Sequence, residues 1–265
     1  MGPQPQSGIG SQDPAARLRF EHEVERIMDA AHATGLTLRI LGSLAFHLHC
    51  PRYGYLQAAL GRVYTDIDLA GYSREASAVQ KLLSGRLGYT ADEMMYVESE
   101  GARMMFEHPT THIHVDVFLD KLDFNHTVSW RSRLEHDAPT VPLAELLLEK
   151  MQIVRINAKD VIDTILLLLE HPLGESDDET IDIGRVARLC AGDWGLWRTT
   201  TMNLEKVKQL RVGFPQLTEQ QQGAVADQVD RALARIASEP KTLGWRMRNR
   251  IGDRMKWHKD VDEVK

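Results

Sequence analysis

The sequence predicts an α+β protein, with a mixed β-sheet core flanked by helices and an all-helical C-terminal domain after it. Residues 36–120 alternate short apolar or period-two segments with helical ones, and strand patterns stop after Pro139. The 265 residues, 43% hydrophobic and 26% charged, are enough to bury such a core. We therefore divide the chain into a flexible tail at 1–12, a core at 13–139 and a helical domain at 140–265.

Helices and strands alternate in the first half of the chain. Gly35 is a natural end for the first helix, and the segment TDIDLAG has the two-residue period of a strand. The tight turn His108-Pro109-Thr110 predicts that the last two strands form a hairpin. In order we expect a helix at 14–34, a strand at 36–41, a helix at 44–49, a loop with a helical turn at 51–64, a strand at 65–71, a helix at 73–87, and strands at 103–108 and 111–120.

The second half predicts helices only. Pro142 suits the first position of a helix, and an acidic loop is expected at 171–179. The expected helices are 143–156, 158–170, 181–191, 200–212, 218–238 and 243–257.

Charge and composition restrict the partners and the compartment. The net charge of −6 disfavours nucleic-acid binding except through a local basic patch. Two cysteines are too few for a disulfide scaffold, and the opening residues lack the pattern of a secretory signal. The longest apolar stretch, 165–169, is far too short to span a bilayer. We expect a cytoplasmic protein with no membrane association.

Three aspartates lie on strands with one buried face. Asp66 and Asp68 share a face of their strand, because side chains two residues apart point the same way. Asp116 belongs to a strand with the same alternation, and pairing of the two strands would bring all three carboxylates together. Such a group repels itself unless a cation joins it, and Mg²⁺ prefers oxygen ligands together with substrate phosphates. The pattern predicts a magnesium site that takes a polyphosphate substrate.

The turn at Gly42 and Ser43 connects a predicted strand to a predicted helix. Glycine allows close backbone approach, serine offers a hydroxyl, and the N-terminus of a helix favours anions. This turn is a candidate site for the phosphates.

Together, LGSLAF at 41–46, R-x-Y-T-D-I-D-L at 62–69 and HVDVF at 114–118 resemble the nucleotidyltransferase superfamily with the polymerase-β-like core. The resemblance implies that Gly42 and Ser43 hold a triphosphate and that Asp66, Asp68 and Asp116 bind metal. The 22 residues between Ser43 and Asp66 are more than the common pattern has, so an inserted loop is expected.

The sequence around Lys150 is similar to that of AbiEii-type toxin nucleotidyltransferases, in which a lysine is followed by a basic-Asp-x-x-Asp pattern. Here the pattern is Leu148-Glu149-Lys150, then Lys159-Asp160-x-x-Asp163. Lys150 is a candidate phosphate ligand. For Asp160 and Asp163 we keep two hypotheses. They have a functional role, or they have a structural role in which they pair with nearby basic residues. The likeness makes a toxin role, with an antitoxin as partner, one candidate.

These features predict magnesium-dependent transfer of a nucleoside monophosphate from an NTP to an acceptor hydroxyl, with release of pyrophosphate. Two ions bound by Asp66 and Asp68 would stabilise the attacking and leaving oxygens, while Asp116 binds one ion and accepts the acceptor's proton. The sequence does not identify the acceptor, and an antibiotic, a protein and tRNA all remain candidates. One alternative is a non-catalytic nucleotide- or RNA-binding module. Another is a metal hydrolase in which His112, His114 and Asp116 bind zinc from one strand face.

A basic segment near the C-terminus is the candidate surface for tRNA. Residues 241–259 hold seven Lys or Arg and one Asp, with Trp245 and Trp257 among them. We expect tRNA to dock through Arg246, Arg248 and Arg250, unless this face is only solvated or paired with an acidic surface.

Overall fold

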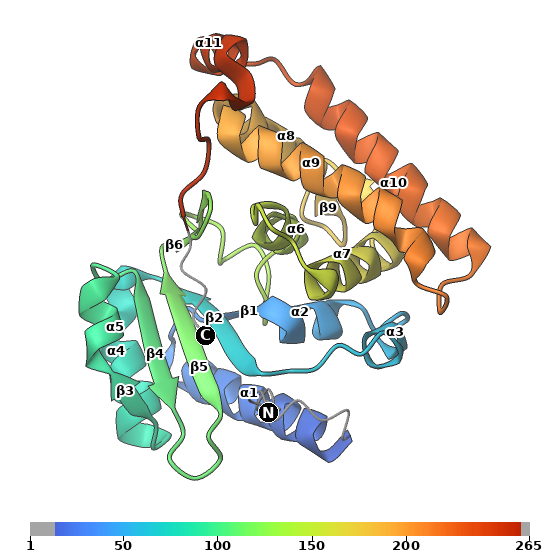
Figure 1. The fold of residues 1–265 in the computed structure, drawn as a ribbon. Coiled ribbons are helices and arrows are strands. Elements are labelled where there is room, and N and C mark those ends of the chain that lie inside the picture. Colours follow the sequence, from blue (N-terminus) through green and yellow to red (C-terminus); the bar gives the residue numbers. More distant parts are fainter. Residues whose placement is uncertain (1–13, 261–265) are drawn as a thin grey trace, which may run out of the picture.

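The computed structural model describes residues 14–260, so the predicted tail at 1–12 lies outside the described residues. It contains a mixed five-stranded sheet in the order β1-β2-β5-β4-β3, with a helical region after it (Figure 1). Strands β2 and β5 are parallel and the other neighbours are antiparallel. The strands are β1 Arg39–Leu41, β2 Asp66–Gly71, β3 Thr90–Asp92, β4 Arg103–Glu107 and β5 His114–Leu119. The α+β prediction is confirmed.

The helices follow the expected order. They are α1 Pro14–Thr34, α2 Gly42–His49, α3 Tyr55–Ala59, α4 Ala76–Gln80, α5 Glu93–Glu98, α6 Leu143–Met151, α7 Ala158–Glu170, α8 Ile183–Gly192, α9 Trp194–Leu210, α10 Glu219–Ser238 and α11 Leu243–Ile251. The predicted bounds of α1 and α7 are confirmed. The single helix predicted at 73–87 is wrong in detail, because a 3-10 turn, Ser73–Glu75, precedes α4 and a π-helical segment, Lys81–Arg86, follows it.

Besides helix α5, the sequence did not predict several short strands. They are β3, β6 Lys121–Asp123, β7 Thr127–Ser129, β8 Leu173–Gly174 and β9 Ile181–Asp182. The parallel pair of β8 and β9 corrects the expectation that the second half is purely helical. A strand of two or three residues is too short to show a periodicity, so its pattern cannot be read from sequence.

Local sequence explains where the main elements begin and end. Gly35 has a φ of +72°, which glycine adopts without strain, and it follows the last turn of α1. Helix α7 begins with a capping box, in which the Asn157 side chain accepts from backbone N–H groups and Asp160 accepts from the Asn157 N–H. In β2, Ile67 and Leu69 are fully buried on one face. That burial fixes the register and turns the aspartates to the other face.

The sheet and the helical region share one hydrophobic core. The buried apolar side chains form a continuous cluster that extends from α1 to α10. Helices α6 and α7 both contact α2, which follows β1, and Figure 1 shows them stacked over it. The helical region is therefore placed against the turn at Gly42 and Ser43. The domain boundary at 139/140 stays a prediction.

Within residues 14–260, every helix is either too short or too polar for a transmembrane span. The cytoplasmic location stays a prediction.

Candidate active site

The three predicted carboxylates lie on one face of the sheet. Strands β2 and β5 are parallel neighbours, and Asp68 is the register partner of Asp116. Residues paired in this way point to the same side, and Asp66 is two residues before Asp68. The other side is apolar and fully buried, lined by Ile67, Leu69, Val115 and Val117. The fold thus brings together the three aspartates that the sequence selected.

Asp68 is the most perturbed carboxylate of this group. Burial raises its pKa well above the usual range, and the charges of Asp66, Glu149 and Asp116 raise it further. No described residue donates a hydrogen bond to its carboxylate. Asp66, by contrast, accepts a hydrogen bond from the Thr65 hydroxyl at 3.1 Å. A carboxylate that is buried near three others and lacks a donor is a favourable place for a cation.

Asp116 has a cationic partner that the sequence analysis missed. Arg103 on β4 donates from Nη2 to Oδ2 at 2.6 Å and from Nε to Oδ1 at 3.3 Å. Burial raises the pKa of Asp116, while the Arg103 hydrogen bonds and charge lower it, and the net direction is upward. Arg103 is the register partner of Phe118, two residues after Asp116, so it reaches Asp116 diagonally across the hairpin. The predicted hairpin contained this contact, but its register could not be read.

The turn at Gly42 lies directly against Asp68. Gly42 is the first residue of α2 and has a φ of +69°. A Cβ at this position would stand 2.2 Å from Asp68 Oδ2, so only glycine fits without a shift. The Ser43 backbone carbonyl accepts a hydrogen bond from Gln57 Nε2 at 3.2 Å, while no described residue hydrogen-bonds the Ser43 hydroxyl. The expected phosphate turn is therefore adjacent to the carboxylates.

Glu149 is a second residue that the sequence analysis did not select. Its Oε2 accepts the hydrogen bond that the Gly42 N–H donates, at 3.0 Å, and its side chain is buried. Its Oε1 is 2.7 Å from Lys150 Nζ. The backbone N–H at the start of α2 thus already holds a carboxylate, supplied by α6.

Lys150 is enclosed by acidic groups. Besides Glu149, its Nζ lies 3.4 Å from Asp163 Oδ2 and 3.9 Å from Asp160 Oδ1. Burial lowers its pKa, but these three carboxylates raise it more, so Lys150 is held in its charged form. Asp163 also accepts hydrogen bonds from Arg62 at 3.2 Å. The contacts of Asp160 and Asp163 agree with the structural reading, since they neutralise Lys150 and Arg62 and cap α7.

The alternative set of His112, His114 and Asp116 is not on one strand face. His112 precedes β5 and has a φ of +54°, so the strand alternation does not include it. Its Nδ1 is 2.7 Å from Oε1 of Glu107, and its side chain is exposed. The expectation of a shared face is therefore wrong for His112.

The donor chemistry of the aspartate cluster fits magnesium. Its ligand atoms are hard carboxylate oxygens. Asp68 lies near three other carboxylates, and no described residue donates a hydrogen bond to it. Within residues 14–260, the present side-chain positions bring no three His, Cys, Asp or Glu residues into an arrangement that could hold a metal ion. Binding by all three aspartates would require Asp116 to reorient from Arg103.

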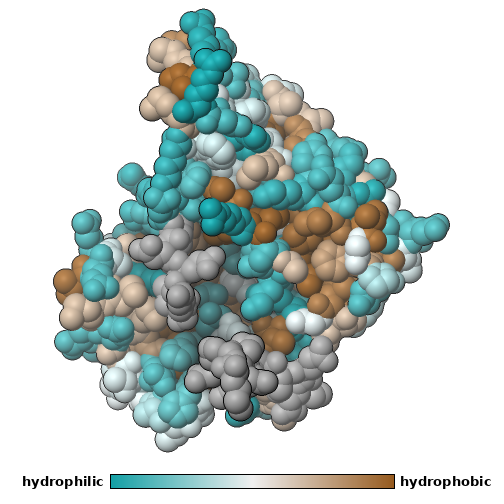
Figure 2. Space-filling view, in the orientation of Figure 1, coloured by the Kyte–Doolittle hydropathy of each residue, from teal (hydrophilic) through white to brown (hydrophobic). Residues whose placement is uncertain are grey.

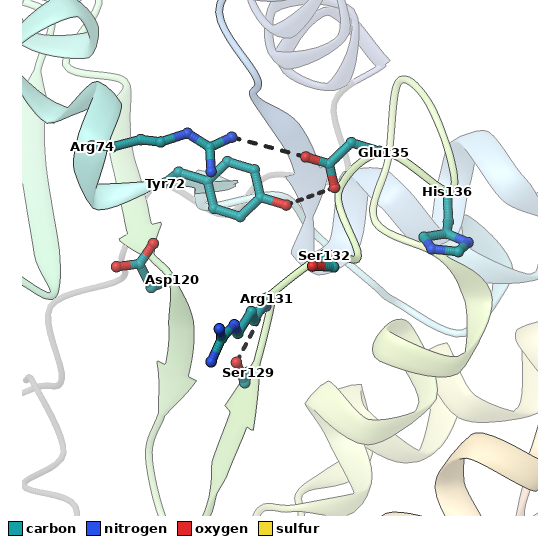
Figure 3. A pocket seen from close by; sticks show the side chains of 8 residues that line it. All are labelled: Tyr72, Arg74, Asp120, Ser129, Arg131, Ser132, Glu135 and His136. Atoms are coloured by element: carbon teal, nitrogen blue, oxygen red, sulfur yellow. Dashed lines mark hydrogen bonds and ion pairs between the residues drawn. The ribbon is translucent and has the colours of Figure 1, made fainter.

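A polar pocket of about 660 Å³ lies at the other end of the same strands (Figure 3). Tyr72 follows β2 and Asp120 follows β5, which places the pocket beyond the carboxyl ends of this parallel pair. Glu135 accepts from the Tyr72 hydroxyl at 2.7 Å and pairs with Arg74 at 3.9 Å. These groups satisfy one another, and the predicted site residues are not among those that line the pocket.

The basic C-terminal face differs from the expectation. Arg248 stacks over the Trp194 ring at 4.3 Å and donates to the Gly252 carbonyl, so it is engaged within the protein. Trp245 packs edge-on against Trp197, and Trp257 Nε1 donates to the Thr199 hydroxyl at 3.1 Å. Both tryptophans and Arg248 are half-exposed and engaged in contacts within the protein. The cations of this segment that have no partner among the described residues are Arg246, Arg250 and Arg254, all exposed.

Apolar side chains accompany these arginines on α11. Leu243, Met247 and Ile251 follow one another at four-residue steps and are 75%, 64% and 40% exposed. Figure 2 shows hydrophobic and hydrophilic side chains side by side over the tip formed by α11. The surface of α11 is therefore mixed, not purely basic.

No family model, no curated protein and no solved structure matches this chain.

Proposed function

We propose that this protein is a magnesium-dependent nucleotidyltransferase that moves a nucleoside monophosphate from an NTP to an acceptor hydroxyl. The observation that carries the proposal is the juxtaposition of Asp66, Asp68 and Asp116 on one sheet face with Gly42 against Asp68. Carboxylates that hold cations beside a helix N-terminus that holds phosphates are the parts that phosphoryl transfer needs.

Asp66 and Asp68 would hold the magnesium ions, and Asp116 would complete the ligand set. When bound, two such ions stabilise the charge on the attacking and leaving oxygens. Asp116 would also accept the proton of the attacking hydroxyl, since it is paired in register with Asp68 on the neighbouring strand. Arg103 donates to both oxygens of that carboxylate, so metal binding by Asp116 would have to displace these two hydrogen bonds.

The triphosphate would lie at the N-terminus of α2. The unpartnered Ser43 hydroxyl is a donor there, and the Gly42 N–H would be one once Glu149 releases it. The absent Cβ of Gly42 leaves room next to Asp68. Lys150 is the candidate phosphate ligand behind this turn, and contact with a phosphate would require it to leave the carboxylates that now surround it.

For the acceptor, tRNA, an antibiotic and a protein are all candidates, and tRNA is the one for which the chain offers a basic surface. The free cations Arg246, Arg250 and Arg254 would contact phosphates, because Arg248 is stacked on Trp194. In a toxin-like role, a protein antitoxin would be the partner.

The test is incubation of the protein with each NTP, labelled at the α-phosphate, together with Mg²⁺ and total cell extract. The proposal expects label in one fraction of the extract, no transfer with γ-labelled NTP, and loss of transfer in Asp66→Asn. Label in tRNA would identify the acceptor. Absence of transfer with every NTP, in protein that is folded, would contradict the proposal.

A non-catalytic nucleotide-binding module is the second candidate. Two contacts favour it: Arg103 engages Asp116, and Glu149 occupies the Gly42 N–H. The two candidates differ in one result, since a binding module would retain NTP without releasing pyrophosphate.

A further inference from the structure

The strongest unexplained contact at the site is the one between Glu149 and the Gly42 backbone. The carboxylate comes from α6, 107 residues further along the chain, and the hydrogen bond is buried. A helix N-terminus attracts an anion because its first N–H groups have no partner within the helix. Glu149 therefore occupies the position where an external anion would bind.

Glu149 also neutralises the positive charge closest to it. Its Oε1 is 2.7 Å from Lys150 Nζ, while Oε2 takes the Gly42 N–H. One carboxylate thus uses both the amide and the ammonium group that an incoming phosphate could use.

The same carboxylate adds to the repulsion around Asp68. Glu149 accepts the hydrogen bond of the Gly42 N–H, and Gly42 lies against Asp68, so a fourth carboxylate stands beside the three aspartates. A fourth negative group at a cluster of three is unfavourable in the folded protein unless a cation or a rearrangement relieves it. We therefore expect the hydrogen bond between Glu149 and Gly42 to change when magnesium and phosphate bind.

We propose that Glu149 is a built-in anion that competes with the nucleotide's phosphates for the Gly42 N–H and for Lys150. This inference rests on the proposed function, because it assumes that the phosphates bind at Gly42. On binding, the phosphates take the Gly42 hydrogen bond and Glu149 withdraws from it. Glu149 thereby limits the affinity for nucleotide and makes binding depend on Mg²⁺.

The experiment measures binding of magnesium tripolyphosphate by calorimetry, because this ligand tests the phosphate site without a base or an acceptor. We expect Glu149→Gln, which has the same shape without the charge, to bind at least about fivefold more tightly than the wild type. Glu149→Asp keeps the charge and should show no such gain. Glu219→Gln is the matched control, since it removes one charge at an exposed position of α10.

The outcomes separate this inference from the proposed function. Equal or weaker binding by Glu149→Gln, with clear binding by the wild type, would overturn the competing role of Glu149 and leave the nucleotidyltransferase proposal standing. No binding by the wild type or by any of the variants would overturn both.

A second measurement needs no variant and covers the case in which Glu149→Gln does not fold. In the wild type labelled with ¹⁵N-glycine, the Gly42 amide resonance should shift when magnesium tripolyphosphate is added. Binding seen by calorimetry with an unchanged Gly42 resonance would contradict the displacement of Glu149.

Discussion

Asp68 and Asp116 are register partners on the parallel strands β2 and β5, and Gly42 lies against the Asp68 carboxylate. Burial and the charges of Asp66, Glu149 and Asp116 disfavour the ionised form of Asp68, so this arrangement is costly without a ligand. That cost is expected where a protein binds cations, and it makes the cluster accessible to stability measurements.

Asp68→Asn should stabilise the protein at pH 7. The pKa of Asp68 is raised in the folded state, so the folded protein favours the protonated form. At a pH above that raised pKa the carboxylate is ionised, and this lowers the free energy of unfolding. We expect a gain of about 1 kcal/mol or more, since one pKa unit corresponds to about 1.4 kcal/mol. The gain should fade as the pH falls through the raised pKa of Asp68.

Urea unfolding at pH 7 and pH 5 measures this gain. Asp227→Asn, at an exposed position of α10, is the control and should leave the free energy of unfolding unchanged. Destabilisation by Asp68→Asn at pH 7 would show that the carboxylate is compensated in a way that the geometry does not reveal.

Gly42→Ala should abolish nucleotide binding and destabilise the fold more than Gly35→Ala does. Both positions have a positive φ, which costs an alanine about 1 kcal/mol. At Gly35 a Cβ meets nothing within 4 Å, whereas at Gly42 it would be 2.2 Å from Asp68 Oδ2. The difference in thermal unfolding between the two variants separates the effect of the contact with Asp68 from that of the backbone strain. Equal destabilisation would mean that the Gly42 turn relaxes freely.

Glu145→Gln should lower the free energy of unfolding by about 3 kcal/mol, because it removes the buried charge that Arg133 and Arg185 share and leaves Arg133 with Asp177 alone. Glu145 is fully buried and accepts hydrogen bonds from Arg133, at 2.7 and 3.0 Å, and from Arg185. The exposed pair of Arg198 and Asp253 is the comparison, and Asp253→Asn should cost less than about 1 kcal/mol. Urea unfolding of both variants checks the difference, which a similar loss in the two would refute.

His126 should make the protein less stable in mild acid. Burial lowers its pKa to about 4, so the folded state favours the neutral ring, which lies 2.8 Å from the Thr199 hydroxyl. Its contribution is complete above the ordinary pKa of 6.5 and is lost as the pH falls toward 4. His126→Gln should therefore lose less stability than the wild type between pH 7 and pH 5, measured by urea unfolding. His49, whose pKa is also lowered to about 4, keeps part of the dependence in the variant. An unchanged pH dependence in His126→Gln would contradict the assignment.

The sequence predicted the elements that carry the site because their patterns are long or strongly alternating. The 21 residues of α1 and the alternation in β2 and β5 are clear periodic patterns. Because one face of each strand is buried, Asp66, Asp68 and Asp116 lie on the opposite face. Pairing of β2 with β5 followed from that shared alternation. Strand β3 and helix α5 were missed, because three to six residues show too little periodicity.

The contacts that adjust the site could not be predicted in this way. Arg103 reaches Asp116 through the hairpin register, and Glu149 reaches Gly42 from a helix 107 residues away. No spacing in the sequence encodes such a distant pair. Trp245 and Trp257 were interpreted as a nucleic-acid surface from composition, whereas they stack within the protein. A tryptophan has a large apolar surface, and packing decides whether it is exposed.

The most direct test is a crystal structure with Mn²⁺ and a non-hydrolysable NTP, because manganese can be located by its anomalous signal. The account predicts manganese peaks within bonding distance of Asp66 and Asp68, with the phosphates on the Gly42 N–H. Nucleotide bound elsewhere, for example in the polar pocket that Arg74 and Arg131 line, with no metal at the aspartates, would contradict it.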